Sequence, residues 1–386
     1  MRNLFLIVRF ITGALFVFSG LVKLNDPSGF AIKLNEYFDV FAQDVPSLDS
    51  FFRSLKDYSI LLSGSFCALE VLLGVAMLLG WQIRATLSIT TVLIVFFTFL
   101  TGYSAVYNKV TDCGCFGDFI HLEPWDSFKK DLILLLFVGI LLAGIKFNQT
   151  LFQSIRVNQL MMGSTVLTLG FGFYCYFYLP VWDFLPYKKG NDIDFIMNHI
   201  PPGERATDSV DIRFVMQKGS DSVKVTTSQY GDFAQKGYVF VRQDRRVIVK
   251  GYSSPIHDFA IHDLQNGIDY KDSFLKYSGF QVLFIAPFLS STDVSCLSDI
   301  SQLHDFISKK QGMRFYALSS ASKEASNEFA QKHGLKFTFF AADQKMLMTM
   351  ARYNPTVYLF KGSVVIDKWS GMNVPKKEEL EKYMRP

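Results

Sequence analysis

The sequence predicts an α-helical membrane bundle, followed by a small β-rich segment and an α/β domain. Five long apolar stretches lie in the first half of the chain. Residues 1–184 contain 12 Lys plus Arg and 13 Asp plus Glu, whereas the remaining 202 residues contain 27 and 22, so the charge density rises sharply there. The net charge of +4, with both signs interspersed, gives no reason to expect a nucleic-acid partner.

The five apolar stretches predict membrane-spanning helices. Crossing the ~30 Å hydrocarbon layer takes about 20 mostly apolar residues. The stretches that approach this length are Leu4 to Leu24, Tyr58 to Leu79, Ala85 to Tyr107, Leu132 to Ile145, and Val157 to Leu179. The fourth is the shortest. No small-residue cleavage site follows the first, so we expect it to be retained as a helix rather than removed as a signal peptide.

In two of these predicted helices, charged residues share one face with glycines. In the first, positions spaced by four and three share one face, namely Arg9, Gly13, Phe16, Gly20 and Lys23. The same spacing in the second gives Ser63, Cys67, Glu70, Gly74 and Met77. An ionised group at the bilayer centre costs about 2.5–3.5 kcal/mol, so Glu70 needs a partner or a proton. It is either a polar latch between helices or a proton carrier beside a quinone, with Glu70 and Arg9 as the quinone-binding residues. Arg9 enters from the opposite membrane face, which keeps it shallow.

The hexapeptide Cys113-Gly114-Cys115-Phe116-Gly117-Asp118 lies in a short polar loop between the third and fourth stretches. A disulfide between cysteines one residue apart closes a small strained ring, and strained exposed disulfides are labile. Gly114 and Gly117 supply the backbone freedom that such a ring demands. The loop therefore predicts thiol-disulfide exchange, with Cys113 and Cys115 as the reacting residues.

Three other interpretations of this loop remain. A zinc site from Cys113, Cys115 and His121 lacks a fourth ligand and the usual spacing, and we expect no metal. The thiols could be acylated or inert, or they could form a structural disulfide without turnover. The other cysteines, Cys67 and Cys175 among them, have no neighbour, and each fits a small packed residue. The loop pair then reacts with a membrane quinone directly, or a partner protein completes the path; no covalently bound cofactor is expected.

These residues carry a family resemblance. The first helix, with Arg9-Phe-Ile-Thr-Gly13 and Phe18-Ser-Gly-Leu-Val-Lys23, resembles the opening helix of DoxX-like membrane proteins, and Glu70, Gly74, Gly80 and Arg84 resemble their second helix and turn. The CGCFGD loop and the helix after it are similar to the MauE branch, named for methylamine utilisation. The likeness covers about residues 4 to 147. It implies a redox-associated membrane protein that helps thiol-disulfide exchange outside the cytoplasm.

Five crossings place the hexapeptide loop on the same side of the membrane as the C-terminal half. With a cytoplasmic N terminus, the short loops carry more Lys and Arg outside than inside, which opposes this orientation. We still expect a multi-pass protein of the inner (cytoplasmic) membrane with the loop and the C-terminal half on the outer, periplasmic side. Thiol-disulfide chemistry persists in oxidising compartments, and a polar domain after the last helix can be exported whatever its charge.

Between about Asp192 and Tyr252 the pattern changes to short antiparallel strands. Apolar and polar residues alternate in 211–216, 222–226, 238–241 and 246–250. Prolines punctuate the chain before and at the start of this segment, at Pro180, Pro186 and Pro201-Pro202.

From Gly279 onward strands and helices alternate. We expect strands at 280–287, 313–318, 336–341, 356–360 and 364–369, and helices at 294–310, 323–333, 344–353 and 376–384. This order, with Pro355 between a helix and a strand, resembles thioredoxin-like domains over about residues 270 to 386. The resemblance implies a cis Asn354-Pro355 bond facing the redox position.

The C-terminal domain departs from the thioredoxin-like pattern where the family has its CxxC motif. Here the chain has Ser290-Ser-Thr-Asp-Val-Ser-Cys296, which contains no dithiol. Cys296 could form a mixed disulfide, but a lone helix cysteine more often packs in a core. A binding pocket formed by Cys296, Asn354 and Pro355 is the expected use of this domain.

The sequence thus divides into a helix bundle of the DoxX/MauE type (1–150), a fifth transmembrane helix (151–185), a β-rich linker domain (186–269) and a degenerate thioredoxin-like domain (270–386). We expect a membrane-bound accessory of thiol-disulfide exchange. Its partners would be membrane lipid and an exported thiol protein, and a quinone could accept the electrons. The alternative is a non-catalytic assembly or client-binding factor that uses the last domain as a platform.

Overall fold

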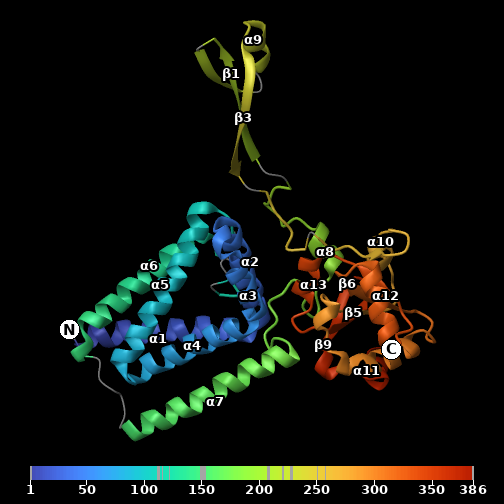
Figure 1. Ribbon diagram of the computed structural model, residues 1–386, viewed down its shortest axis with the longest axis horizontal. Helices are drawn as coiled ribbons and strands as arrows, with labels where there is room; N and C mark the ends of the chain where they lie inside the picture. The colour runs from blue at the N-terminus through green and yellow to red at the C-terminus, as the bar shows by residue number, and fades with distance from the viewer. Residues whose placement is uncertain are drawn as a thin grey trace. The chain divides into compact units, whose positions relative to one another are not determined.

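The computed structural model describes residues 2–110, 114, 116–120, 122–147, 154–206, 209–219, 221–226, 229–249, 251–256 and 258–384 (Figure 1). The chain forms two compact units. One combines Met1–Gly190 with Ala260–Pro386, and the other is Asn191–Phe259.

The first part of the larger unit is helical. In its described residues the α-helices are α1 (Arg2–Asn25), α2 (Pro27–Asp44), α3 (Asp49–Asp57), α4 (Ser59–Leu79), α5 (Ile83–Tyr107), α6 (Pro124–Ala143) and α7 (Ser154–Tyr178). Short 3-10 turns, η1 (Pro46–Leu48) and η2 (Ile145–Phe147), follow α2 and α6. Each of the five predicted apolar stretches lies within or overlaps one of these helices.

Four of the described helices are long and apolar enough to cross a membrane, namely α1, α4, α5 and α7. Helix α6 falls outside this group because Asp126, Lys129, Lys130 and Asp131 occupy its first two turns, which leaves only a short apolar remainder. Four of the five predicted spans are therefore confirmed among the described helices, whereas the fourth stretch, Leu132 to Ile145, is not long and apolar enough to count as one.

Helices α1 and α4 pack through their small residues, as the shared stripe predicts. A methyl group placed on Gly20 would lie 2.7 Å from the backbone nitrogen of Val71, and one on Gly74 would lie 2.7 Å from the backbone nitrogen of Val17. Both backbones therefore approach too closely for any side chain at these positions. The predicted inward face of α1 is buried at both ends, at Arg9 and at Lys23.

Helices α2 and α3 are absent from the sequence predictions, which leave residues 25–57 unassigned. Asp26 caps α2 by accepting a hydrogen bond from the Gly29 backbone at 2.9 Å, and Pro27 occupies the first helical position. Charged residues at intervals along α2 interrupt its apolar stripe, so it lacks the signal of a membrane span.

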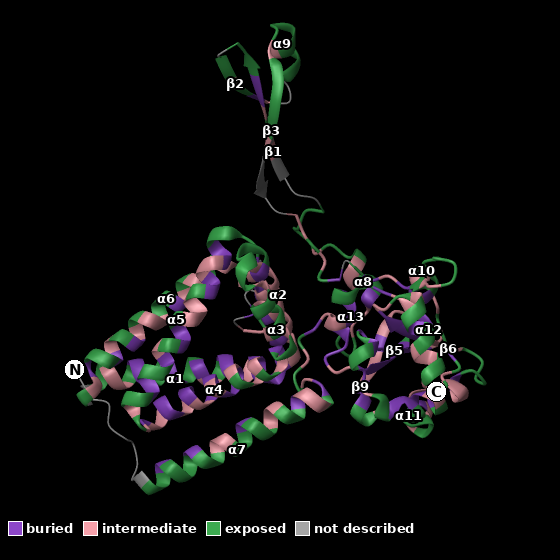
Figure 2. Ribbon diagram, in the orientation of Figure 1, coloured by how far each residue is buried: buried purple, intermediate pink, exposed green. Residues whose placement is uncertain are grey.

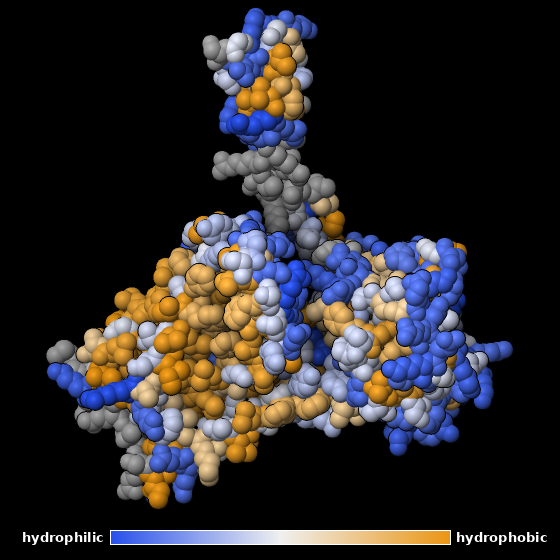
Figure 3. Space-filling view, viewed as in Figure 1, coloured by the Kyte–Doolittle hydropathy of each residue, from blue (hydrophilic) through white to orange (hydrophobic). Residues whose placement is uncertain are grey.

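The bundle exposes apolar side chains, as a lipid-facing surface does. Half of the membrane-length window in α4 is buried, against 17% of the window in α7, which is largely exposed in Figure 2. Figure 3 shows the hydrophobic colour concentrated over the helices of the first part of the chain and hydrophilic colour over the α/β domain. The two parts of this unit therefore present surfaces suited to lipid and to water respectively.

The α/β domain is built on a six-stranded sheet. Its strands are β4 (His262–Asp263), β5 (Phe280–Ile285), β6 (Met313–Ser319), β7 (Phe339–Ala341), β8 (Thr356–Lys361) and β9 (Val364–Ser370). The order is β4-β7-β6-β5-β8-β9. Strand β5 is parallel to β6 and antiparallel to β8, and β6 is parallel to β7. This is the thioredoxin-like arrangement that the sequence predicts; the short β4 was not expected.

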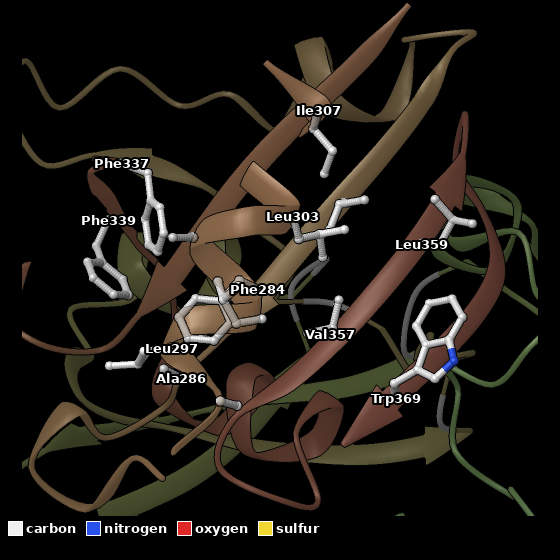
Figure 4. Packing of buried hydrophobic residues seen from close by; sticks show 14 of the residues in the cluster. Phe284, Ala286, Leu297, Leu303, Ile307, Phe337, Phe339, Val357, Leu359 and Trp369 are labelled. Atoms are coloured by element: carbon white, nitrogen blue, oxygen red, sulfur yellow. The ribbon is translucent and has the colours of Figure 1, made fainter. Parts of the chain in front are cut away.

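Helices cover this sheet and close its core. They are α10 (Lys271–Leu275), α11 (Leu297–Ile307), α12 (Lys323–Lys332), α13 (Gln344–Met350) and α14 (Lys377–Met384), with 3-10 turns η3 (Leu289–Ser291), η4 (Val294–Cys296) and η5 (Gly371–Asn373). Phe284, Val357 and Leu359 of the sheet pack against Leu303 and Ile307 of α11 (Figure 4). The predicted helix 294–310 starts as the separate turn η4.

The smaller unit contains a three-stranded antiparallel sheet of order β2-β1-β3. Its strands are β1 (Ser209–Lys218), β2 (Asp221–Thr226) and β3 (Val239–Val249), with short helices α8 (Ile193–Asn198) and α9 (Tyr230–Gln235). The antiparallel strands confirm the sequence pattern. The last two predicted strands are joined in the single β3.

Candidate functional site

The hexapeptide loop is described at Gly114 and from Phe116 onward. Cys113, Cys115 and His121 lie outside the described residues, so their predicted roles stay predictions. Gly114 and Gly117 have φ angles of +62° and +52°, as expected from their need for backbone freedom. A methyl group on Gly114 would lie 3.0 Å from the Lys33 side chain of α2, so the loop also passes close to that helix.

Aromatic contacts fix the second half of the loop on the bundle. The rings of Phe116 and Phe119 lie 6.1 and 5.8 Å from the ring of Phe18 in α1. Lys130 of α6 lies 5.1 Å over the Phe116 ring, within range of a cation–π interaction. The loop is therefore held against α1 and α6 rather than projecting freely.

Arg352 of the α/β domain binds this loop directly. Its Nη2 donates to Asp118 at 2.7 Å, and its Nε donates to Asp26, the cap of α2, also at 2.7 Å. Its Nη1 donates to the backbone oxygen of Met348 at 3.0 Å, and Ser28 donates to the Arg352 backbone oxygen at 2.6 Å. One guanidinium thus joins the thiol-bearing loop, the start of α2 and the α/β domain.

The Arg352 side chain is only 6% exposed, and the carboxylates of Asp26 and Asp118 are 11% and 27% exposed. Burial acts to lower the pKa of Arg352, but the two carboxylates outweigh it and raise that pKa overall. The arginine therefore remains charged. Removing either charge would leave the other poorly solvated.

Arg352 lies three residues before Pro355, and the Asn354-Pro355 bond is cis, as the thioredoxin-like resemblance implies. The amide nitrogen of Asn354 donates to the Phe288 backbone oxygen at 2.8 Å, and Thr292 donates to the Asn354 amide oxygen at 3.2 Å. Thr292 belongs to the segment that replaces the CxxC motif, and Phe288 lies two residues before that segment. The cis-proline loop and this segment therefore form one hydrogen-bonded face.

Cys296 faces the core rather than this surface. Its side chain belongs to the hydrophobic cluster of the domain, the residue is 3% exposed, and its thiol donates to the Asp293 backbone oxygen at 3.3 Å. Burial, assisted by the nearby Asp293, raises the pKa of Cys296 from 9.0 to about 12. These observations favour the packed interpretation of Cys296 over a mixed disulfide.

A cleft of about 340 Å³ lies beside the cis-proline face. Phe288, Asp293 and Tyr353 line it from the α/β domain, and Asn35 of α2 and Tyr176 of α7 line it from the bundle. Tyr353 donates to Asp293 at 2.9 Å. Burial, followed by this hydrogen bond, raises the pKa of Tyr353. The cleft combines aromatic walls with a few polar groups, the composition usual in ligand pockets of proteins.

Within the membrane bundle, Glu70 of α4 forms an ion pair with Lys23 of α1. Both side chains are less than a tenth exposed, and the Lys23 ammonium also lies 4.8 Å from the ring centre of Phe97. The predicted need of Glu70 for a partner is met by the lysine on the same stripe. This arrangement supports the latch interpretation of Glu70.

The structure does not bring Arg9 to Glu70, in line with the shallow position expected for Arg9, and the quinone-binding role of the two residues stays a prediction. Arg9 lies 14 residues before Lys23 on the same helix. At ~1.5 Å per residue, the two positions are about 21 Å apart, beyond the reach of an arginine side chain. Arg9 is fully buried near the other end of the bundle.

A second buried acid was missed from the sequence. Asp131 of α6 accepts a hydrogen bond from Thr101 of α5 at 2.9 Å and pairs with Lys130 at 2.9 Å. A small cavity of about 40 Å³ is lined by Glu70, Asp131 and the loop residue Phe116. Polar groups inside the bundle thus reach from the Lys23–Glu70 pair to the base of the loop. Asp131 directly precedes the predicted fourth stretch. An acidic residue at the start of an apolar helix was the sequence feature that could have indicated it.

Asp26, Asp118 and Arg352 were also missed as a group. Asp118 belongs to the hexapeptide, and Asp26 stands before a proline at the end of a predicted helix, but no local pattern joins them to Arg352. Among the described residues no cluster of His, Cys, Asp and Glu could hold a metal ion. Cys67 and Cys175 are buried and free, in α4 and α7 respectively.

The fold and this site define a multi-pass helical membrane protein that carries a thioredoxin-like domain. Residues 1–144 match the family model described as methylamine utilisation protein MauE. This match covers the helices from α1 to α6 and the hexapeptide loop. A search of the curated proteins finds no match.

Solved structures similar to this chain cover its thioredoxin-like part. An exposed lipoprotein thioredoxin of Streptococcus pneumoniae is 17% identical, with 33% of this chain and 98% of that chain covered and a TM-score of 0.27. The C-terminal domain of a protein described as a thiol-disulfide oxidoreductase from Bacteroides thetaiotaomicron is 12% identical, with 33% and 89% covered and a TM-score of 0.27. A peroxiredoxin-like protein of Aquifex aeolicus is 12% identical, with 33% and 81% covered and a TM-score of 0.26.

Proposed function

We propose that this protein is a membrane-bound accessory of thiol-disulfide exchange outside the cytoplasm. Cys113 and Cys115 exchange electrons with an exported thiol protein, and a membrane quinone accepts the electrons. The protein lies in the inner (cytoplasmic) membrane with the loop and the thioredoxin-like domain on the periplasmic side. The DoxX-like resemblance of the first two predicted helices agrees with this proposal but stays a prediction.

One observation carries the proposal, namely the salt bridge between Arg352 and Asp118. It ties the CGCFGD loop to the residue that precedes the cis-proline face of a thioredoxin-like domain. In such a domain that face is where thiol partners are held, so a client bound in the adjacent cleft would lie beside the loop. The shared location also supports the prediction that the loop and the domain occupy one side of the membrane.

The exchange consists of two successive nucleophilic substitutions at sulfur, which together transfer two electrons and two protons from the client to the loop pair. A client thiolate attacks one sulfur of the Cys113–Cys115 disulfide, which breaks that S–S bond and forms a mixed disulfide. The second client thiolate then attacks the mixed disulfide, so the client leaves oxidised and the loop pair has gained two electrons and two protons. A quinone that takes up these electrons and protons becomes a quinol and restores the loop disulfide.

Trapping thiols in intact cells with an alkylating reagent tests this function. We expect Cys113 and Cys115 to occur in both oxidised and reduced forms, and their ratio to change when the exported thiol proteins are reduced. The matched control is Cys296→Ser, which leaves the loop pair unchanged and should behave like the wild type. A Cys113–Cys115 pair that stays in one state under both conditions would contradict the proposal.

A second candidate function is a non-catalytic client-binding factor. The burial of Cys296 and the lack of a second cysteine in the segment that replaces CxxC favour it, because the cleft then serves only to hold a partner. The double variant Cys113→Ser with Cys115→Ser separates the two functions. Retained activity on the client in cells would support the binding role, and lost activity would support exchange.

A further inference from the structure

An aromatic-lined groove opens on the bundle next to the thiol-bearing loop. It has a volume of about 430 Å³ and is formed by α2, α3 and the last turns of α5. We call it the aromatic groove; its lining includes Tyr37, Phe41, Phe51, Phe52, Phe99 and Tyr103. Phe51 and Phe99 are more than half exposed, so the groove is open to the surroundings of the bundle.

The rings of the groove form a cluster around Phe41, and Phe51 and Phe99 are the members exposed to a further flat ring. Phe99 stacks on Phe41 with an interplanar angle of 29° and a centroid distance of 6.1 Å. Tyr103 meets Phe41 edge to face at 5.1 Å, and Phe52 lies 5.6 Å from the same ring. Offset stacking and edge contacts of this kind are the geometry in which aromatic groups attract one another. An acyl chain would gain nothing specific from it.

The groove lies close to the described residues that flank Cys113, namely Val110 and Gly114. Val110, which is 2% exposed, packs with Tyr37 and Leu100, and both of these residues line the groove. Gly114 touches Lys33, one turn before Tyr37 in α2. The chain on both sides of Cys113 therefore contacts the helix that forms one wall of the groove.

The floor of the groove leads to groups that can exchange protons. The Tyr37 hydroxyl and the Ser104 hydroxyl share a hydrogen bond of 2.8 Å. Tyr37 also lines a small inner cavity of about 20 Å³ together with Lys23, the partner of Glu70. A ligand ring in the groove would thus lie one side chain away from a buried, proton-bearing pair.

Charge favours an uncharged head group over a phospholipid phosphate. Among the described residues that line the groove, the charged one is Asp44, which is acidic and already paired with Lys109 and Tyr103. A second apolar groove of about 300 Å³, formed mainly by α4 and α7, is lined mostly by aliphatic and small residues, and its aromatic members are Phe173 and Tyr176. That groove suits an acyl chain better than a ring.

We propose that the aromatic groove binds a membrane quinone, with its ring against the exposed rings of Phe51 and Phe99 and its apolar tail in the lipid. The inference rests on the proposed function and names the acceptor site for it. The reduced pair supplies two electrons and two protons: two S–H bonds break, one S–S bond forms, and both quinone carbonyls become hydroxyls. Tyr37, with Ser104, is the group in place to hydrogen-bond a carbonyl of the ring.

Binding can be tested without the redox step. The full-length chain carrying Cys113→Ser and Cys115→Ser, in lipid nanodiscs, is titrated with decylubiquinone. Adding Phe99→Leu should weaken binding about two- to twelvefold, because the apolar area remains while the ring contact, worth about 0.5–1.5 kcal/mol, is lost. The matched control is Phe173→Leu in the second groove, since Phe173 and Phe99 are similarly exposed, at 63% and 58%. Leu55→Trp, which adds bulk to the aromatic groove, should weaken binding as well.

The outcomes test the quinone-binding groove and the proposed exchange function separately. Equal binding by the Phe99→Leu, Leu55→Trp and unsubstituted proteins would overturn the proposed groove, and so would a loss confined to Phe173→Leu. Full competition by a short-chain phospholipid would overturn it too, because that result indicates a lipid site. The redox arm uses the reduced wild-type protein and follows quinol formation in a single turnover. Groove-dependent binding without quinol formation would support the site and count against the exchange function.

Discussion

Two of the buried ion-pair systems in the described part of the chain differ in what they connect. Lys23 and Glu70 join α1 and α4, which already pack through Gly20 and Gly74. Arg352 instead joins Asp118 and Asp26, which lie 234 and 326 residues away in the chain. The first pair therefore stabilises a contact that small residues already make, whereas the second holds the thiol-bearing loop against another domain. Similar charges thus serve stability in one place and positioning in the other.

Breaking the membrane pair should have the largest effect on stability. Glu70→Ala leaves the Lys23 ammonium buried without its carboxylate, and we expect a loss of about 3–5 kcal/mol in the free energy of unfolding. Unfolding in detergent micelles measures it. The double variant Lys23→Met with Glu70→Met removes both charges and should recover most of the loss. A change below about 1 kcal/mol for Glu70→Ala would mean that the pair is no latch.

Removing the interdomain arginine should have a smaller effect on stability and a larger one on the loop. Arg352→Ala leaves Asp26 and Asp118 without their cation. The Asp118 carboxylate is 27% exposed and can be hydrated, so we expect a loss near the low end of about 2–5 kcal/mol. Alkylation of reduced Cys113 and Cys115 should become several-fold faster, because the loop loses its anchor to the α/β domain.

Asp118→Asn is the matched control for Arg352→Ala, since it keeps the bond between Arg352 and Asp26. It should accelerate alkylation of the loop while lowering stability by only about 1 kcal/mol. Unchanged alkylation rates in both variants would contradict the positioning role.

The smallest effect is expected at Cys296. Cys296→Ala removes one packed sulfur and should cost about 1 kcal/mol, with thiol exchange unchanged. Because its pKa is raised to about 12, the folded state keeps Cys296 neutral, and this thiol's contribution to stability falls as pH rises above its ordinary value of 9.0. Native protein near pH 8 should resist maleimide at this position until it is unfolded. Rapid labelling of native Cys296 would show that it is accessible.

The sequence predicted the elements whose patterns are local. Alternation in the β-rich segment predicted its antiparallel strands, and apolar runs such as 280–287 predicted the central strand β5. The membrane stripes predicted which faces of α1 and α4 are buried. In each case the periodicity of a single segment carries the information, because burial on one face is decided within that segment.

The remaining features depend on contacts between distant segments. Helix α2 mixes charges such as Lys33 and Glu36 with apolar positions, so it has no membrane-length signal. The Lys23–Glu70 pair needs the antiparallel register of two helices, and the Arg352 site needs three segments to meet. The thiols Cys113 and Cys115, the residues on which the functional prediction depends most, lie outside the described residues.

The glycine contacts between α1 and α4 decide which parts of the protein can change shape. At Gly20 and Gly74 the backbone of one helix is the surface on which the other rests, so neither can slide or turn without collision. These two helices therefore form a rigid pair within the bundle. We expect measurements of backbone motion to find α1 and α4 less mobile than the peripheral helices.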